Sequence, residues 1–312
     1  MKIAVTSKAF AANEPLVKLL KAHFPQCKFN TTGKLLNKEQ LIAFAENCDG
    51  MILALEEINE DVLAQLPKLK AIAKYGVGLD NIDKQVCEEN GVELLWTGGV
   101  NKGSVAEMAL GFMLMLQRRL WLGALKLGDG QWLKNGGQSL YGATVGVIGL
   151  GHIGKELVKL LKPFNCKIIV NDIEYDEEFV ISHGLIKASK EALFSQCDII
   201  SLHTPLTKDT RYLINERSLS LCKSNAFILN TARGGLVEED ALKQALLSGQ
   251  ISGAAIDVYE QEPPTDLEFL KIENLITTPH IGGNSAQAVY AMGESAINHL
   301  RTYFENRSHD SL

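Results

Sequence analysis

Short apolar runs alternate with segments of helical periodicity along most of the chain. In the first hundred residues the apolar runs are typical of buried strands, and between them apolar residues recur at the spacing of one helix face. Strands are predicted near Ile3–Thr6, Gly50–Ala54, Leu69–Ala73 and Glu93–Leu95, and helices near Pro15–Phe24, Lys38–Glu46 and Asp61–Leu66. This alternation is typical of a parallel sheet covered by helices.

A glycine-rich seam, Trp96–Ser104, interrupts the alternation and predicts a domain boundary. A long apolar helix, Val105–Gln117, follows it, and the alternation then restarts. A last helix near Ser285–Tyr303 is too distant in sequence to be assigned to a domain from local pattern. The strands predicted after the seam are Val145–Ile148, Ile168–Asp172, Ile199–Leu202, Phe227–Asn230, Ala254–Asp257 and Leu275–Thr278.

Composition sets limits on the class of protein. A length of 312 residues, 46% of them hydrophobic and 22% charged, predicts about two globular domains. The net charge is −6 and no block of Lys and Arg stands out, so neither a nucleic-acid nor a membrane partner is expected. The longest apolar run, Met108–Leu116, is too short to span a membrane. Six scattered cysteines without a CxxC pair predict packed thiols in a reducing cytoplasm and no metal site.

The segment VGVIGLGHIGKELVK, Val145–Lys159, has the glycine spacing of a dinucleotide-binding turn. A β-branched strand precedes the glycines and a helical pattern follows them, which is the context that the motif requires. Gly149 would allow the tight turn, Gly151 the approach of a pyrophosphate, and Gly154 the packing of helix on strand. The helix N-terminus would then offer N–H groups to the phosphates.

An acidic residue about twenty positions on completes the motif, and Asp172 lies 18 residues after Gly154. A carboxylate there accepts hydrogen bonds from both ribose hydroxyls of NAD and repels the extra phosphate of NADP. The same stretch also begins like a P-loop, but Glu156 stands where that loop needs Ser or Thr for magnesium. A glycine turn without any ligand remains a weaker alternative. NAD is therefore the predicted cofactor.

Three polar residues follow later predicted strands, where an open parallel sheet binds its ligands. The guanidinium of Arg233 is suited to bind a carboxylate through two hydrogen bonds, and the alternative is a surface arginine that caps a loop. His280 follows Pro279, and a lone histidine is more often structural. Glu262 follows the strand that ends at Asp257, in a stretch that could be a solvated acidic loop. Glu260, Glu268 and Glu273 lie nearby, and the residues alone allow no choice among the four.

In its ordered motifs the sequence resembles the D-isomer-specific 2-hydroxyacid dehydrogenases, which include D-lactate, glycerate, formate and phosphoglycerate dehydrogenases. The matching segments cover nearly the whole chain and are KYGVGLDNID, VNKGSVAEMALGFMLML, GLGHIG, LHTPLTKDTRYLI, LNTARGGLVEEDAL, AAIDVYEQEPP and TPHIGG. The resemblance implies that Arg233 binds the substrate carboxylate, that His280 transfers the proton, and that Glu262 is its partner.

The resemblance also implies the remaining contacts. Asp257 would contact the nicotinamide side of the cofactor, and backbone groups of the loop Tyr75–Gly78 would hold the substrate carboxylate. The expected cofactor-binding residues are Gly149, Gly151, His152, Ile153, Gly154, Asp172, His203, Thr204, Pro205, Thr231, Ala232, Asp257, Gly282 and Gly283. The expected substrate-binding residues are Lys74, Tyr75, Gly76, Val77, Gly78, Asn101 and Arg233.

For the fold, the resemblance implies two doubly wound α/β domains, with a Rossmann NAD domain inserted into a flavodoxin-like substrate domain. Residues 1–100 and 285–312 would form the substrate domain, and residues 101–284 the NAD domain, with both ligands in a cleft that closes on binding. The helix from Val105 is expected to form a homodimer. A non-catalytic NADH-binding scaffold, like a corepressor of this fold, is the alternative function.

The substrate is predicted only as a small D-2-hydroxy acid or its 2-oxo acid. KYGVGLDNID is close to relatives called phosphoglycerate dehydrogenases, and Lys74 could supply one positive charge. Ala54–Glu57, however, offers no Lys or Arg where such relatives place basic side chains. The length also leaves no room for their serine-sensing regulatory domain. A phosphorylated substrate is therefore in doubt.

Overall fold

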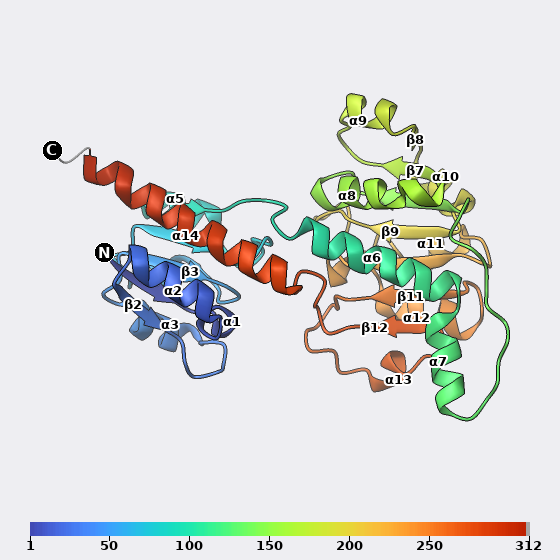
Figure 1. The fold of residues 1–312 in the computed structure, drawn as a ribbon, viewed down its shortest axis with the longest axis horizontal. Helices are drawn as coiled ribbons and strands as arrows, with labels where there is room; N and C mark the ends of the chain where they lie inside the picture. The colour runs from blue at the N-terminus through green and yellow to red at the C-terminus, as the bar shows by residue number, and fades with distance from the viewer. Residues whose placement is uncertain (310–312) are drawn as a thin grey trace. The chain divides into compact units, whose positions relative to one another are not determined.

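The computed structural model describes residues 1–309, and these divide into two compact units. Unit 1 consists of residues 1–101 together with the described part of 286–312, and unit 2 consists of residues 102–285. Each unit has a parallel β-sheet with helices on its two faces (Figure 1). Unit 1 is therefore discontinuous in sequence, because α14 (Ala286–His309) packs on β3, β4 and α2.

The sheet of unit 1 has five strands in the order β2-β1-β3-β4-β5, and every neighbouring pair is parallel. This is a flavodoxin-like order. The strands are β1 (Lys2–Val5), β2 (Gln26–Phe29), β3 (Gly50–Leu53), β4 (Ala71–Lys74) and β5 (Glu93–Leu95).

The helices of unit 1 form two layers over this sheet. On one face, α1, α2 and α14 bury side chains such as Phe10, Leu16 and Ile297; on the other, α3, α4 and α5 bury Leu41, Val62 and Cys87. The helices before α14 are α1 (Lys8–Ala11), α2 (Glu14–His23), α3 (Lys38–Ala45), α4 (Glu60–Leu63) and α5 (Lys84–Glu89).

The sheet of unit 2 has seven parallel strands in the order β12-β11-β10-β9-β6-β7-β8. The chain order reverses between β6 and β9, which is the switch point where sheets of this kind bind ligands. The strands are β6 (Thr144–Ile148), β7 (Lys167–Asn171), β8 (Ile186–Lys187), β9 (Ile199–Leu202), β10 (Phe227–Asn230), β11 (Gly253–Ile256) and β12 (Leu275–Thr277).

Helices cover both faces of this second sheet. One core lies under α6 and α8, and the other lies under α10, α11 and α12 (Figure 1). The helices are α6 (Lys102–Gln117), α7 (Leu120–Gly128), α8 (His152–Leu161), α9 (Glu177–Ser182), α10 (Lys190–Gln196), α11 (Glu216–Ser220), α12 (Glu239–Leu247) and α13 (Leu267–Leu270), with short 3-10 turns η1 (Lys162–Phe164) and η2 (Gly234–Leu236).

The predicted fold class is confirmed: both sheets are parallel and doubly wound. The element prediction missed β2, whose side chains alternate between exposed and half-buried, because a short polar edge strand carries no apolar run. It also missed α7, and it began the helix after the seam three residues late. No helix among residues 1–309 is long and apolar enough to cross a membrane, and that range holds no group of three potential metal ligands.

Candidate active site

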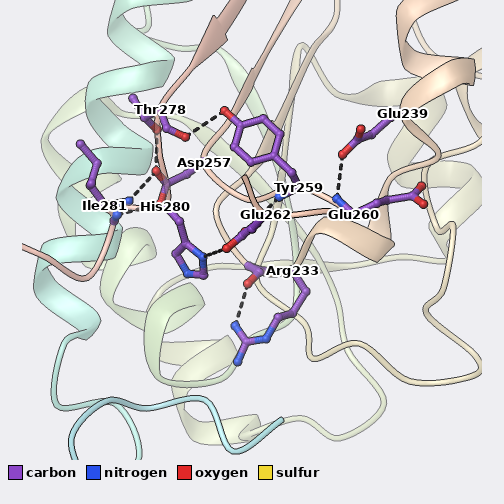
Figure 2. A network of polar contacts seen from close by, with 11 residues as sticks. Arg233, Glu239, Asp257, Tyr259, Glu260, Glu262, Thr278, His280 and Ile281 are labelled. Atoms are coloured by element: carbon purple, nitrogen blue, oxygen red, sulfur yellow. Dashed lines mark hydrogen bonds and ion pairs between the residues drawn. The ribbon is translucent and has the colours of Figure 1, made fainter. Parts of the chain in front are cut away.

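Three loops of unit 2, which follow β10, β11 and β12, carry the candidate residues Arg233, Glu262 and His280. Because neighbouring parallel strands end at the same edge of a sheet, these loops lie together (Figure 2). A Cβ placed on Gly234 would lie 1.9 Å from the backbone of Tyr259, so the Arg233 loop packs directly on the loop of Glu262. Only glycine fits at that contact.

His280 and Glu262 form a pair, with Nδ1 of the imidazole 2.7 Å from Oε2 of the carboxylate. Because a carboxylate only accepts hydrogen bonds, Nδ1 carries the proton and Nε2 is left to exchange a proton with a substrate. The other Glu262 oxygen accepts from the backbone N–H of Tyr259 at 3.1 Å. Glu260 instead accepts from the hydroxyl of Tyr212 at 3.1 Å. The geometry thus pairs Glu262, and not Glu260, with His280, a choice that the residues alone left open.

The loop that carries His280 is tied down by Asp257, which is buried at the end of β11. One carboxylate oxygen accepts from the backbone N–H of Ile281 at 2.8 Å, and the other accepts from that of Gly282 at 2.7 Å. The hydroxyl of Thr278 donates to the same carboxylate (Figure 2). His280 has a left-handed φ of 53°, a conformation that a non-glycine residue adopts only where its surroundings fix it.

Arg233 lies just beyond the end of β10 in an ordered loop. Its carbonyl oxygen accepts from the side chain of Asn230 at 2.8 Å, and its guanidinium donates to the carbonyl of Ala232 at 2.7 Å. Asn230 also accepts from the backbone N–H of Ala232 at 3.1 Å. Asn230 is fully buried, so the backbone beneath Arg233 is fixed by a side chain of the sheet itself.

The glycine turn lies between β6 and α8, as the motif requires. Gly149 has a φ of +97°, and a Cβ there would lie 2.5 Å from the backbone of His203. A Cβ on Gly154 would lie 2.1 Å from the carbonyl oxygen of Gly149. Gly151 faces open space at the N-terminus of α8, where no side chain caps the helix. These features fit a dinucleotide pyrophosphate.

Asp172 comes directly after β7 and faces this turn. Its carboxylate accepts from the backbone N–H of Leu150 inside the glycine motif and from that of Ile173 at 2.7 Å. The carboxylate is therefore held beside the turn, where the adenosine ribose of a dinucleotide binds. Lys155 pairs with Asp176 at 2.7 Å, and Glu156 lies 3.7 Å from Lys102, so both side chains form ion pairs at the surface.

Two buried polar atoms without a protein partner lie on residues expected to contact the cofactor, His203 Nδ1 and Thr231 Oγ1. Burial lowers the pKa of His203 to about 4, so the ring is neutral near neutral pH. Its Nε2 is 2.8 Å from the hydroxyl of Ser201. Since buried polar atoms are normally satisfied, the orphaned atoms fit a site completed by a bound group.

In unit 1 the expected substrate loop Tyr75–Gly78 leaves the carboxyl end of β4. The buried Lys74 donates to the carbonyl of Ala54 and to Asn81 Oδ1 at 2.7 Å, so its ammonium braces the base of the loop. Trp96 holds the loop from another side, because its indole N–H donates to the carbonyl of Val77 at 2.8 Å. Sequence reasoning missed this contact, since nothing local to Trp96 identifies its partner.

Other expected residues lie where their segments place them. Tyr75 and Asn101 each have a buried polar atom without a protein partner. Gly282, which follows His280, accepts from the hydroxyl of Ser104 at 2.6 Å through its carbonyl. His152 and Ile153 begin α8, Thr204 and Pro205 follow β9, and Gly283 follows Gly282.

Known proteins resemble this chain over most of its length. Residues 110–282 match the model of the D-isomer-specific 2-hydroxyacid dehydrogenase NAD-binding domain. The chain is 37% identical over 273 residues to a hydroxypyruvate reductase of Thermotoga maritima, which covers 85% of this chain and 88% of that protein. It is 36% identical over 262 residues, 83% of its length, to the D-3-phosphoglycerate dehydrogenase of Rattus norvegicus, but spans only 49% of that protein.

Solved structures agree with these matches. The D-lactate dehydrogenase of Aquifex aeolicus, complexed with NAD and lactic acid, has a TM-score of 0.84 and 26% identity, and the match covers 98% of this chain and 96% of that one. The apo D-lactate dehydrogenase of Escherichia coli has a TM-score of 0.85 and 27% identity, with 98% of both chains covered. From the family model and the relatives above, the chain belongs to the D-isomer-specific 2-hydroxyacid dehydrogenase family, and it is an oxidoreductase with an NAD-binding domain that acts on CH–OH groups.

Proposed function

We propose that this protein interconverts a small, unphosphorylated D-2-hydroxy acid and its 2-oxo acid with NAD(H). The observation that carries the proposal is the His280–Glu262 pair in the loops beside Arg233. When bound, the nicotinamide would supply or accept the hydride. The protein must then bind the acid, move one proton and stabilise the charge that develops on oxygen.

In this proposal each of the three side chains has one task. During reduction His280 donates a proton from Nε2 to the developing alkoxide, and during oxidation it takes the proton back. Glu262 fixes the ring through Nδ1 and stabilises its protonated form. Arg233 forks onto the substrate carboxylate and stabilises negative charge on the carbonyl oxygen.

The charges in unit 1 support an unphosphorylated substrate. Lys74, the cation expected nearest the substrate loop, donates to Ala54 and Asn81 from a buried position. After β3 the chain carries Glu56 and Glu57 but no Lys or Arg, and the buried Glu56 accepts from the hydroxyl of Thr6 at 2.6 Å. A phosphate dianion near these carboxylates would be repelled. The names of the relatives point to both kinds of substrate. The hydroxypyruvate reductase and a glyoxylate reductase of Thermofilum pendens, which is 37% identical, are named for unphosphorylated acids, and the D-3-phosphoglycerate dehydrogenase is named for a phosphorylated one.

A substrate panel tests this proposal. We expect NADH oxidation with hydroxypyruvate, glyoxylate or pyruvate at a kcat/KM at least about 100-fold above that for phosphohydroxypyruvate. This ratio corresponds to about 3 kcal/mol, which we attribute to repulsion of the phosphate by the carboxylates and to the absence of a cation that pairs with it. Steady-state assays at fixed ionic strength measure the ratio. A preference for the phosphorylated acid would refute this choice of substrate. Turnover with none of the acids would instead support a non-catalytic NADH-binding scaffold.

Asp172 is proposed to select NAD over NADP. Its carboxylate lies beside the glycine turn, where it would bond the ribose hydroxyls and repel a 2′-phosphate. We expect Asp172→Ala to lower the ratio of kcat/KM for NADH over NADPH by about 10- to 100-fold. Asp176→Ala, which removes a nearby carboxylate that pairs with Lys155, is the matched control. An unchanged ratio in Asp172→Ala would exclude Asp172 as the ribose ligand.

A homodimer is proposed, but through α7 rather than through α6 alone. One face of α6 is buried within unit 2, including Phe112 and Met113. None of the nine residues of α7 is buried in the described chain, although most are apolar. An exposed apolar helix of this kind marks an association surface. Because most soluble oligomers are symmetric assemblies of identical chains, a second copy of this chain is the expected partner. The exposed leucines of α7 are Leu120, Leu125 and Leu127, and the segment after the helix exposes Trp132 and Leu133.

The dimer is tested with a charge on that surface. We expect the wild type to sediment as a dimer and Leu127→Glu to shift it toward the monomer, raising the dimer dissociation constant by at least about tenfold. Leu247→Glu, at an equally exposed leucine that ends α12, is the control. Analytical ultracentrifugation over a concentration series measures both. A monomeric wild type would contradict the proposal.

The six cysteines are all free, which supports a reducing compartment such as the cytoplasm.

A further inference from the structure

Tyr259 bonds to Glu262 and to the turn that leads to His280. Its backbone N–H donates to the Glu262 carboxylate at 3.1 Å, on the oxygen that does not face the imidazole. Its side-chain hydroxyl donates to the carbonyl oxygen of Thr278 at 2.9 Å, two residues before His280 (Figure 2). One residue at the end of β11 thus reaches the loops of both members of the pair.

The same Thr278 carbonyl also accepts from the backbone N–H of His280 at 3.0 Å. The contacts therefore close into a ring that runs from Tyr259 through Glu262, His280 and Thr278 back to the Tyr259 hydroxyl. Tyr259 is buried, and burial raises its pKa to about 12, so the hydroxyl stays a donor over the working pH range.

The ring of hydrogen bonds restrains His280 and Glu262, whose side chains are only partly packed. The side chains of His280 and Glu262 are 52% and 40% exposed, so packing alone does not hold them. His280 also keeps a left-handed backbone. A proton donor works only if it stays within hydrogen-bond reach of its target, and a small displacement lowers the rate strongly.

We propose that Tyr259 is a positioning residue for proton transfer, whose hydroxyl holds the turn of His280 against Glu262. This inference rests on the proposed function only in that it assigns proton transfer to His280. Tyr259 itself does not touch the reacting atoms. Its effect should therefore appear in the catalytic step and not in cofactor binding.

Tyr259→Phe removes the hydroxyl and keeps the aromatic side chain, so it opens the ring of hydrogen bonds. We expect kcat with the best 2-oxo acid to fall about 5- to 20-fold, the effect of losing one hydrogen bond that acts on the transition state. The dissociation constant of NADH, from fluorescence titration, should stay within about twofold, and so should KM for the acid. Tyr212→Phe is the matched control, because it removes a neighbouring hydroxyl that bonds Glu260 instead. A kcat within twofold of wild type in Tyr259→Phe would overturn the inference.

A double-mutant cycle separates positioning from a general structural role. If Tyr259 acts through the pair, Tyr259→Phe should have almost no further effect on kcat in a Glu262→Gln background. A loss as large as in the wild-type background would overturn the inference.

A measurement without turnover keeps the inference distinct from the proposed function. The Nδ1 proton of His280, assigned in NMR spectra by its absence in His280→Ala, should exchange with water at least about fivefold faster in Tyr259→Phe than in Tyr212→Phe. Equal exchange rates would overturn the inference. Absence of turnover by the wild type would contradict the proposed function alone.

Discussion

His280→Ala is expected to lower kcat by about 10²- to 10⁴-fold, the range that a positioned acid–base group supplies. Nε2 is the nitrogen that can exchange a proton, because Nδ1 faces Glu262 at 2.7 Å. NADH binding should persist, since the glycine turn and Asp172 lie at β6 and β7, away from the loop of His280. Stopped-flow NADH oxidation measures the rate, and fluorescence titration measures the binding.

Two matched controls sharpen this expectation. His183→Ala removes a histidine that stacks on Phe179 and should leave kcat unchanged. Glu262→Gln should lower kcat about 10- to 100-fold, whereas Glu260→Gln should have little effect, because only Glu262 pairs with the imidazole. Turnover like that of the wild type in His280→Ala would exclude the assigned proton donor.

Arg233→Ala is expected to lower kcat/KM for the 2-oxo acid by about 10³-fold, which corresponds to about 4 kcal/mol of transition-state stabilisation. A guanidinium can fork onto the substrate carboxylate and also face the carbonyl oxygen, so both binding and chemistry depend on it. The loop below Arg233 is fixed through Asn230 and Gly234, which keeps the effect local to the side chain. Steady-state kinetics at varied concentrations of the 2-oxo acid measure this kcat/KM.

Lysine at the same position separates charge from shape. Arg233→Lys keeps the charge but loses the fork, and we expect it to recover no more than about tenfold of the lost kcat/KM. Arg211→Ala, in a nearby loop over the Tyr212 ring, is the control and should behave like the wild type. Full activity in Arg233→Lys would show that a point charge suffices and would contradict the bidentate role.

Several features of this protein could be predicted from its sequence because their causes are local. The parallel α/β class follows from apolar runs that alternate with helical periodicity, and the turn at Gly149–Gly154 follows from glycine spacing between a strand and a helix. The prediction failed at β2, because this short edge strand has only two half-buried side chains, Cys27 and Phe29, and is placed by its pairing with β1.

Only the tertiary structure decided which groups meet. Glu260 and Glu262 have the same chemistry two positions apart, and the side chain that faces His280 depends on how the loops after β11 and β12 pack. Lys74 is buried and donates to Ala54 and Asn81, and nothing in its own segment of the sequence indicates these partners. The hydrogen-bond partners of Tyr259 could not be predicted from the sequence. Sequence periodicity and glycine spacing act within a segment, whereas hydrogen-bond partners are fixed by contacts between segments far apart in the chain.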